Sequence, residues 1–126
     1  MSDELAVSLV NQLLQALERI ERRFGKISSF AEFVESEEGR EKLDGICMQL
    51  IAVGEGLKKL ETIGGNALFL RHPEIEWKKA MAMRDILSHH YFEVNPEIVY
   101  NTCKNKIPPL KACIVQMLSE LSSEKI

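Results

Sequence analysis

Apolar residues recur at spacings of three and four along most of the chain, a pattern typical of helices with one buried face. The pattern predicts a long helix over residues 5–24, a second over about 38–63, a third that begins near Pro73, and a helical C-terminal region from residue 96. No segment alternates between apolar and polar residues as a half-buried strand does. We therefore expect an all-α fold, an up-and-down bundle of about five helices.

Residues that favour helix ends divide these segments. Ser2 is the expected N-cap of the first helix, and Gly25 its expected end. Asn95-Pro96 provides an N-cap and a first helical residue for the C-terminal region. Because proline has no backbone N–H, Pro108-Pro109 should kink or split that region.

Glycines within and after the second helix predict a close contact and a break. Gly54 and Gly56 each weaken a helix by roughly 1 kcal/mol relative to alanine. The usual structural reason for such a glycine is the close approach of another helix. Gly64-Gly65-Asn66 should end the helix, and a loop around residues 64–72 should lead to the next one, with Pro73 in its first turn.

A short helix and an acidic stretch separate the first two long helices. Ser29 and Glu32 have capping-box spacing, and an apolar patch of Phe30, Phe33 and Val34 follows the serine. Residues 32–44 contain six acids and two bases, a net charge of −4, so the rest of the chain sums to about +1. The stretch is most simply a solvent-exposed helix start, and a surface for a basic partner is the alternative.

Composition limits the classes of function. The length of 126 residues fits one domain over residues 1–126, and a net charge of −3 argues against a protein that coats DNA or RNA through bulk charge. The longest apolar runs are too short to span a membrane, and the N-terminal residues show no signal-peptide pattern.

The cysteines and histidines show no metal-binding spacing. Cys47, Cys103 and Cys113 are odd in number, form no C-x-x-C pair and lie in helical apolar patterns. We expect them to pack as small hydrophobic side chains, which favours a reducing cytoplasm over a disulfide framework. The three histidines also lack the spacing of a zinc site, so we expect no metal and no cofactor, and a role at the start of a helix suffices for His72.

The strongest candidate for chemistry is a polar cluster near the end of the third long helix. On a regular helix Arg84 lies about 140° from His89, so the two would converge only if the helix ended near Ser88 or if a second subunit completed the site. The cluster consists of Arg84, Asp85, Ser88, His89, His90 and Tyr91, and Arg84, Ser88 and Tyr91 share one face.

This residue set is suited to cleavage of an RNA backbone by its own 2′-hydroxyl. A histidine can transfer a proton near neutral pH, and an arginine can hold a phosphate by two parallel hydrogen bonds. Asp85 could orient Arg84 or a histidine. The alternative is a surface charge pair at Arg84-Asp85, with histidines that interact with the negative end of the helix dipole.

At this cluster the sequence resembles the HepT-like family, which belongs to the HEPN superfamily of small helical ribonuclease toxins. The family motif R-x4-H-x-Y matches Arg84, His89 and Tyr91 at every fixed position. The flanking segments also resemble the family: Val53-Gly54-Glu55, Ile75-Glu76-Trp77, Met83-Arg84-Asp85, Val94-Asn95-Pro96-Glu97-Ile98-Val99-Tyr100 and Ile107-Pro108-Pro109-Leu110.

The resemblance implies a helical homodimer in which Arg84 and His89 of both subunits line one cleft. It implies a metal-independent endoribonuclease, the toxin of a type VII-like toxin–antitoxin pair, with RNA and not DNA as its substrate. It further implies that an MntA-type nucleotidyltransferase antitoxin transfers AMP to Tyr91. By the same resemblance Arg84 would bind phosphate, His89 would be the general acid or base, and Asp85 would orient the site.

A second hypothesis is a non-catalytic helical adaptor that binds a minimal nucleotidyltransferase and presents a target to it. The net acidic charge and the lack of a broad basic stretch motivate it.

Overall fold

The computed structural model describes residues 3–123, apart from the side chains of Asp3 and Tyr91. Over this range the chain forms helices and no strand, which confirms the expected all-α fold. The helices of at least ten residues are α1 (Asp3–Phe24), α3 (Glu37–Leu60), α5 (Trp77–His89), α6 (Pro96–Asn105) and α7 (Ile107–Ser123).

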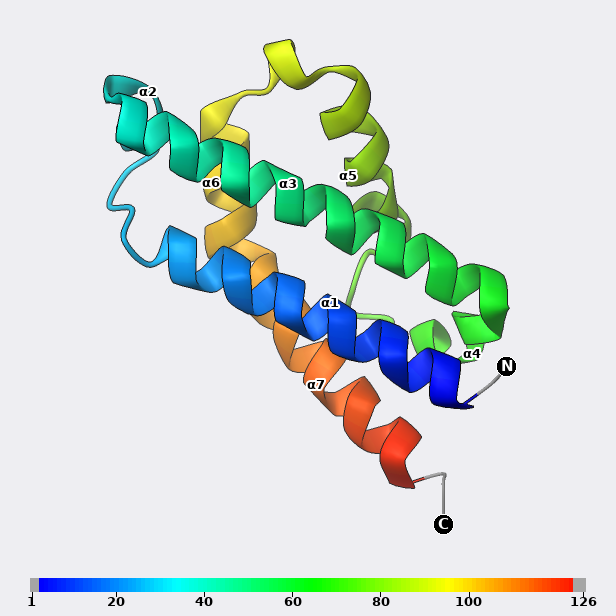
Figure 1. Cartoon of the computed structure of the whole chain (residues 1–126). Coiled ribbons are helices and arrows are strands. Elements are labelled where there is room, and N and C mark those ends of the chain that lie inside the picture. The colour runs from blue at the N-terminus through cyan, green and yellow to red at the C-terminus, as the bar shows by residue number, and fades with distance from the viewer. Residues whose placement is uncertain (1–2, 124–126) are drawn as a thin grey trace.

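The central helix of the bundle is α3. It lies beside α1, which runs in the opposite direction, and it also contacts α5 (Figure 1). In turn, α7 packs against α1 and α6. Shorter helices occur in the connections: α2 (Glu32–Glu35), η1 (Glu61–Gly65), α4 (Asn66–Leu70) and η2 (Tyr91–Glu93).

The buried faces of the long helices follow the apolar pattern of the sequence. Full burial of one such aliphatic side chain stabilises the fold by about 1.5–3 kcal/mol. Leu5 is an exception, because 47% of it is exposed. Gly25 follows the last residue of α1 as expected, whereas Ser2 lies outside the described residues. The fully enclosed core side chains include Leu13, Leu17, Ile20, Ile46, Leu50, Leu57, Leu60, Ile107, Ile114, Met117 and Leu121.

Gly54 and Gly56, two of the four glycines inside α3, lie where other helices come closest. A Cβ atom on Gly56 would lie 2.7 Å from Cδ2 of Leu13 in α1. A Cβ atom on Gly54 would meet the backbone and the Cβ of Arg84 in α5. The expected close approach is thus confirmed, and Gly54 permits α5 to bring Arg84 against α3.

The break after α3 occurs at Gly64, whose φ of 99° is accessible mainly to glycine. The chain then returns at once to helix as α4, so the expected loop around residues 64–72 was wrong over residues 66–70. The physical reason is that Leu68 and Phe69 are buried, and a helical turn lets both reach the core while their backbone groups stay bonded.

The helix α5 begins at Trp77, so the expected start at Pro73 was wrong. Residues 71–76 instead form a loop, and the Trp77 side chain bonds back to the start of it. The indole Nε1 donates hydrogen bonds to the backbone oxygens of Phe69 at 3.1 Å and His72 at 2.9 Å. These bonds hold the loop in a non-helical path up to the tryptophan.

The capping box expected before α2 was also wrong. Glu32 does reach back, but its Oε2 accepts a hydrogen bond from the backbone N–H of Ser28 at 2.8 Å, and no side chain caps α2. Of the expected apolar patch only Phe33 is buried. The acidic residues that follow lie at the largely exposed start of α3, as expected.

The C-terminal region is divided as the prolines predict. Asn95 caps α6 by accepting from the backbone N–H of Glu97 at 2.9 Å, and Pro96 is the first helical residue. The division falls at Lys106, and Pro108-Pro109 lies in the first turn of α7, where a missing donor breaks no intrahelical bond.

All three cysteines are buried as free thiols, as the sequence predicts. Burial is the largest cause that raises the pKa of Cys47, Cys103 and Cys113 to about 12, so each is a neutral thiol near pH 7. Among residues 3–123, no helix has the length and apolar character needed to cross a membrane.

Candidate functional site

The Arg84 side chain lies between α5 and α3 and is about one third exposed. Its Nε donates a hydrogen bond to Oε1 of Glu55 on α3 at 3.3 Å, and its Nη1 donates to Oδ1 of Asp85 at 2.9 Å. Two carboxylates on different helices therefore fix the plane of the guanidinium group. The contact between Asp85 and Arg84 is present, as both an orienting role and a surface charge pair predict.

The same carboxylate of Asp85 joins a second cation. Its Oδ2 accepts from Nζ of Lys58 on α3 at 3.0 Å. Lys58, Asp85, Arg84 and Glu55 thus form a chain of alternating charges, which we call the Arg84 network. Hydrogen bonds from Arg84 and then Lys58 lower the pKa of Asp85, and those to Asp85 and Glu55 raise the pKa of Arg84. Arginine is charged at any physiological pH, so what the network adds is a fixed orientation of the Arg84 guanidinium.

Two members of this network, Glu55 and Lys58, were not identified from the sequence as site residues. Glu55 lies next to Gly54, so the helix position that admits α5 also places a carboxylate beside it. Lys58 follows one helical turn after Gly54 on the same face. The signal available in the sequence was the glycine itself, because a close helix crossing brings its polar neighbours into contact.

His89 is the last residue of α5 and is exposed. Because α5 continues through it, an early helix end near Ser88 does not bring Arg84 and His89 together. The ~100° turn per residue directs the two side chains about 140° apart. Within the described part of the chain, no hydrogen bond or ion pair joins them.

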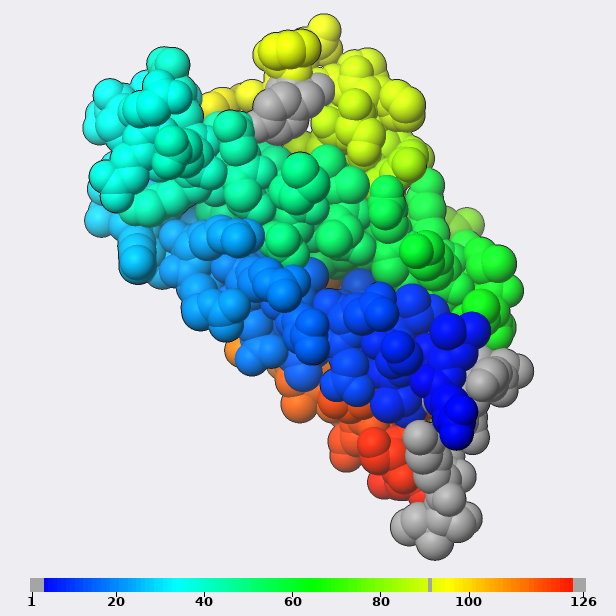
Figure 2. Space-filling model, viewed as in Figure 1, coloured from blue at the N-terminus to red at the C-terminus, as the bar shows by residue number. Residues whose placement is uncertain are grey.

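His90 lies at the C-terminal end of α5, with Nδ1 3.5 Å from Oε2 of Glu93. It lines a groove of about 540 Å³ between α5 and α6 that also contains Ile86, Val94 and Ile98. The next residue, Tyr91, begins η2, and its side chain lies outside the described residues. In Figure 2 the segment after α5 projects from the upper edge of the molecule.

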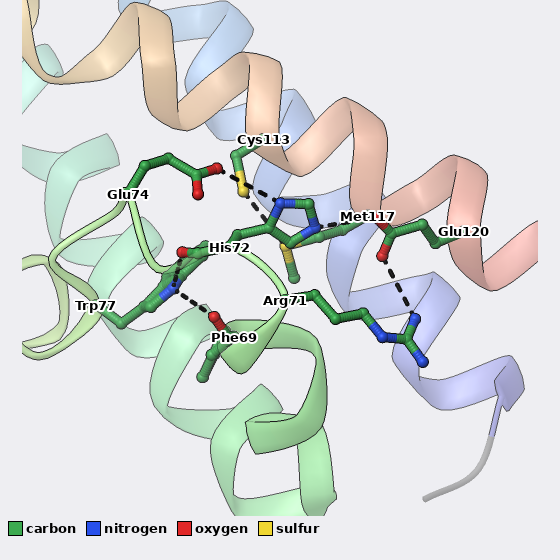
Figure 3. Close-up of polar contacts among 8 residues, drawn as sticks. All are labelled: Phe69, Arg71, His72, Glu74, Trp77, Cys113, Met117 and Glu120. Carbon is green, nitrogen blue, oxygen red and sulfur yellow. Dashed lines mark hydrogen bonds and ion pairs between the residues drawn. The ribbon is translucent and has the colours of Figure 1, made fainter.

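The third histidine, His72, is buried and does not merely start a helix. Its Nε2 lies 3.0 Å from Oε1 of Glu120 on α7, and its Nδ1 lies 3.5 Å from Oε1 of Glu74 (Figure 3). The Cys113 thiol on α7 lies on the Nδ1 side of the ring. We call His72, Glu74, Cys113 and Glu120 the His72 cluster, and it belongs to different elements from the Arg84 network.

Comparison with known proteins identifies one family. A family model described as Ribonuclease HepT-like matches residues 13–117, which include the whole segment from Arg84 to Tyr91. No solved structure matches the chain significantly.

Several named proteins are similar to the chain over part of its length. A Methanocaldococcus jannaschii protein named "Putative RNase" is 28% identical over 96 residues, which are 76% of this chain and 74% of that protein. A second, named "Gamma-glutamylcyclotransferase and putative RNase", is 28% identical over 116 residues, 92% of this chain and 49% of that protein. The Thermococcus cleftensis protein named "Probable ribonuclease HepT" is 39% identical over 59 residues, 47% of this chain and 50% of its own length.

Proposed function

The chain belongs to the ribonuclease HepT-like family, and from that premise we propose that it is an endoribonuclease toxin that cleaves RNA through Arg84 and His89. The observation that carries this proposal is the guanidinium of Arg84, held in one orientation by Glu55 and Asp85. A group fixed in this way is prepared to stabilise charge that builds on a phosphate.

In the proposed reaction the 2′-hydroxyl of a ribose attacks the adjacent phosphorus and the 5′-oxygen leaves. His89 would accept the proton of the 2′-hydroxyl or donate one to the leaving oxygen. Arg84 would bind the non-bridging oxygens, whose negative charge grows as the new bond forms. The products are a 2′,3′-cyclic phosphate and a free 5′-hydroxyl. Asp85 would act as a positioning residue through its bond to Arg84.

We propose that two copies of the chain complete each site. On one α5 helix Arg84 and His89 point about 140° apart, so one phosphate is more easily reached by Arg84 of one copy and His89 of the other. Ile86 and Ile98 lie beside the groove and are 58% and 63% exposed. Such exposed apolar side chains near His89 suit a surface that a second copy of the chain covers.

Growth arrest on expression and cleavage of purified RNA in buffer with a chelator test the proposal. Arg84→Ala and His89→Ala should each relieve the arrest and reduce cleavage by roughly 100-fold or more. Arg19→Ala removes an exposed arginine on α1, and His90→Ala removes the neighbouring histidine, so both should retain activity. Equal cleavage by the wild type and both site variants would contradict the proposal.

Mixing the two inactive variants tests whether the site is shared. In a mixed dimer one site loses both groups and the other keeps Arg84 and His89. Random exchange makes half of the dimers mixed, so activity should return to about a quarter of the wild-type value. If each chain used its own pair, the mixture would stay inactive, because every site would then lack one group.

We further propose that an MntA-type nucleotidyltransferase antitoxin neutralises the protein by transferring AMP from ATP to the Tyr91 hydroxyl, with pyrophosphate as the leaving group. Phosphates added at Tyr91, two residues after His89, would bring negative charge that competes for Arg84 and repels RNA. Co-expression should increase the intact mass by whole AMP units. Tyr91→Phe should abolish the gain, and Tyr100→Phe, the change at the only other tyrosine, should not. A Tyr91→Phe protein that still gains AMP would show that the acceptor is another residue.

The second candidate function is a non-catalytic adaptor for a nucleotidyltransferase. The charges of the Arg84 network favour it, because the carboxylates of Glu55 and Asp85 cancel the positive charges of Arg84 and Lys58. The network therefore has no net positive charge with which to attract RNA. An adaptor would leave RNA uncut yet bind the nucleotidyltransferase. RNA cleavage that His89→Ala abolishes would exclude it.

A further inference from the structure

Three side chains of different chemical type meet between the loop at residues 71–76 and α7. One possible ligand atom each from His72, Glu74 and Cys113 lies within 4.8 Å of the other two. His72 and Cys113 are both buried, each 4% exposed, whereas the Glu74 side chain is 60% exposed. The group therefore has a buried floor and an opening to solvent on the Glu74 side.

Glu120 determines which nitrogen of His72 faces this opening. A carboxylate 3.0 Å from Nε2 favours the tautomer with the proton on Nε2, so Nε2 donates to Glu120. In that tautomer Nδ1 carries a lone pair, and it faces the Glu74 carboxylate 3.5 Å away. A proton on Nδ1 or a metal ion between the two atoms would make this contact favourable, and a metal ion could also bind the nearby Cys113 sulfur. A carboxylate behind a histidine is also the usual support of a metal-bound imidazole.

The donors indicate which cation fits. One imidazole nitrogen, one sulfur and one carboxylate oxygen suit Zn²⁺ and similar first-row divalent ions, whereas Mg²⁺ and Ca²⁺ prefer oxygen ligands. Tetrahedral bonds of about 2.0–2.3 Å place neighbouring ligand atoms about 3.5 Å apart. The Nδ1-to-Oε1 distance of 3.5 Å already meets this spacing.

We propose that His72, Glu74 and Cys113 bind Zn²⁺ or a chemically similar divalent ion, with water at the open fourth position and Glu120 orienting His72. The ligands come from distant parts of the sequence, which explains why no ligand spacing predicted a metal. The site lies outside the Arg84 network, so it is structural and takes no part in the proposed RNA cleavage.

Metal binding should hold two groups of helices together. The helix α5, which presents Arg84, packs mainly on α3, whereas α7 packs on α1 and α6. The loop at residues 71–76 links the two groups of helices through His72 and through the ion pair of Arg71 with Glu120. A metal that joins Glu74 to Cys113 would fasten the start of α5 to α7.

Cobalt titration of the reduced, chelator-treated protein tests this site, because a cobalt–thiolate bond gives an intense near-ultraviolet charge-transfer band. We expect the band to saturate at one Co²⁺ per chain and to vanish when Zn²⁺ is added. Free Zn²⁺ at about 100 times its Kd should raise the Tm by roughly 10 °C. A folded wild-type protein with no band would overturn the proposal and leave His72 as a buried, ion-paired histidine.

Variants assign the ligands. Cys113→Ser should abolish the band, and the Cys47→Ser, Cys103→Ser double variant should keep it. Glu74→Gln changes an exposed side chain, so it should fold normally and bind Co²⁺ at least about tenfold more weakly. Helical circular dichroism checks the fold of each variant. A band that persists in Cys113→Ser, or unchanged affinity in Glu74→Gln, would overturn the assignment.

Discussion

Gly54 on α3 faces the backbone of Arg84 on α5 with no room for another carbon atom. A Cβ atom on Gly54 would lie 2.7 Å from Cβ of Arg84 and 3.1 Å from its backbone nitrogen. Neither contact involves the flexible end of a side chain, so only a shift of one helix could relieve it. The position of the candidate catalytic arginine therefore depends on a missing side chain in another helix.

Gly54→Ala should destabilise the protein although alanine favours helix. Crowding in a packed interface costs about 1–3 kcal/mol, which exceeds the helix-propensity gain of about 1 kcal/mol. The displaced Arg84 should also lower RNA cleavage. Gly45→Ala is the matched control in α3, because its Cβ would meet only the Arg23 side chain at an ordinary 3.5 Å. In urea unfolding, Gly45→Ala should be the most stable protein, the wild type intermediate and Gly54→Ala the least stable. The reverse order would show that Gly54 tolerates a side chain.

The bond between Asp85 and Arg84 should make stability depend on acidic pH. Hydrogen bonds from Arg84 and then Lys58 lower the folded-state pKa of Asp85 below its unfolded value of about 3.9. Its contribution is therefore present above about pH 4 and is lost as pH falls through the lowered pKa. The difference in unfolding free energy between wild type and Asp85→Asn should be constant at pH 5–7 and shrink below about pH 4. A difference that grows on acidification would contradict this.

Lys58→Met provides the companion measurement, because it removes one of the two cations that Asp85 contacts. The folded-state pKa of Asp85 should then lie closer to its unfolded value. The acid-dependent difference between Lys58→Met and the Lys58→Met, Asp85→Asn double variant should be smaller than that between wild type and Asp85→Asn.

Most of the fold follows from local sequence rules, and the failures lie where tertiary contacts decide. The long helices, the Asn95 cap and the split before Pro108 are set by apolar period and by backbone donors, which neighbouring residues specify. The start of α5 depends instead on the Trp77 indole, which binds carbonyl oxygens of a preceding turn. Helix propensities take no account of that hydrogen bond.

The candidate site was predictable only as a segment. The motif identified Arg84, His89 and Tyr91, and the polar cluster around it identified Asp85. Glu55 and Lys58 come from another helix, and their contacts depend on the crossing at Gly54. The catalytic roles of Arg84, His89 and Tyr91 stay predictions. His72 was assigned to a helix start, because the partner that explains its burial, Glu120, lies far away in the sequence.

Alkaline pH should destabilise the protein through its buried thiols. Burial raises the folded-state pKa of Cys103 to about 12, whereas an unfolded thiol has a pKa near 8.5. Between these values the unfolded chain binds fewer protons, so stability falls by up to about 1.4 kcal/mol per pH unit for each thiol. Cys103→Ala should remove one such slope between pH 9 and 11 under anaerobic, reducing conditions. An unchanged slope would show that Cys103 ionises easily in the folded protein.

Trp77→Phe should cost about 1–3 kcal/mol, because the indole N–H bonds to Phe69 and His72 are buried and phenylalanine replaces neither. The stacked contact with the Phe69 ring would be kept in part, since the ring centroids lie 4.5 Å apart. Tyr100→Phe, which removes only the exposed bond to the backbone oxygen of Ser28, should cost about 1 kcal/mol or less. Urea unfolding followed by circular dichroism compares the two, and equal costs would show that the indole bonds do not hold the loop at residues 71–76.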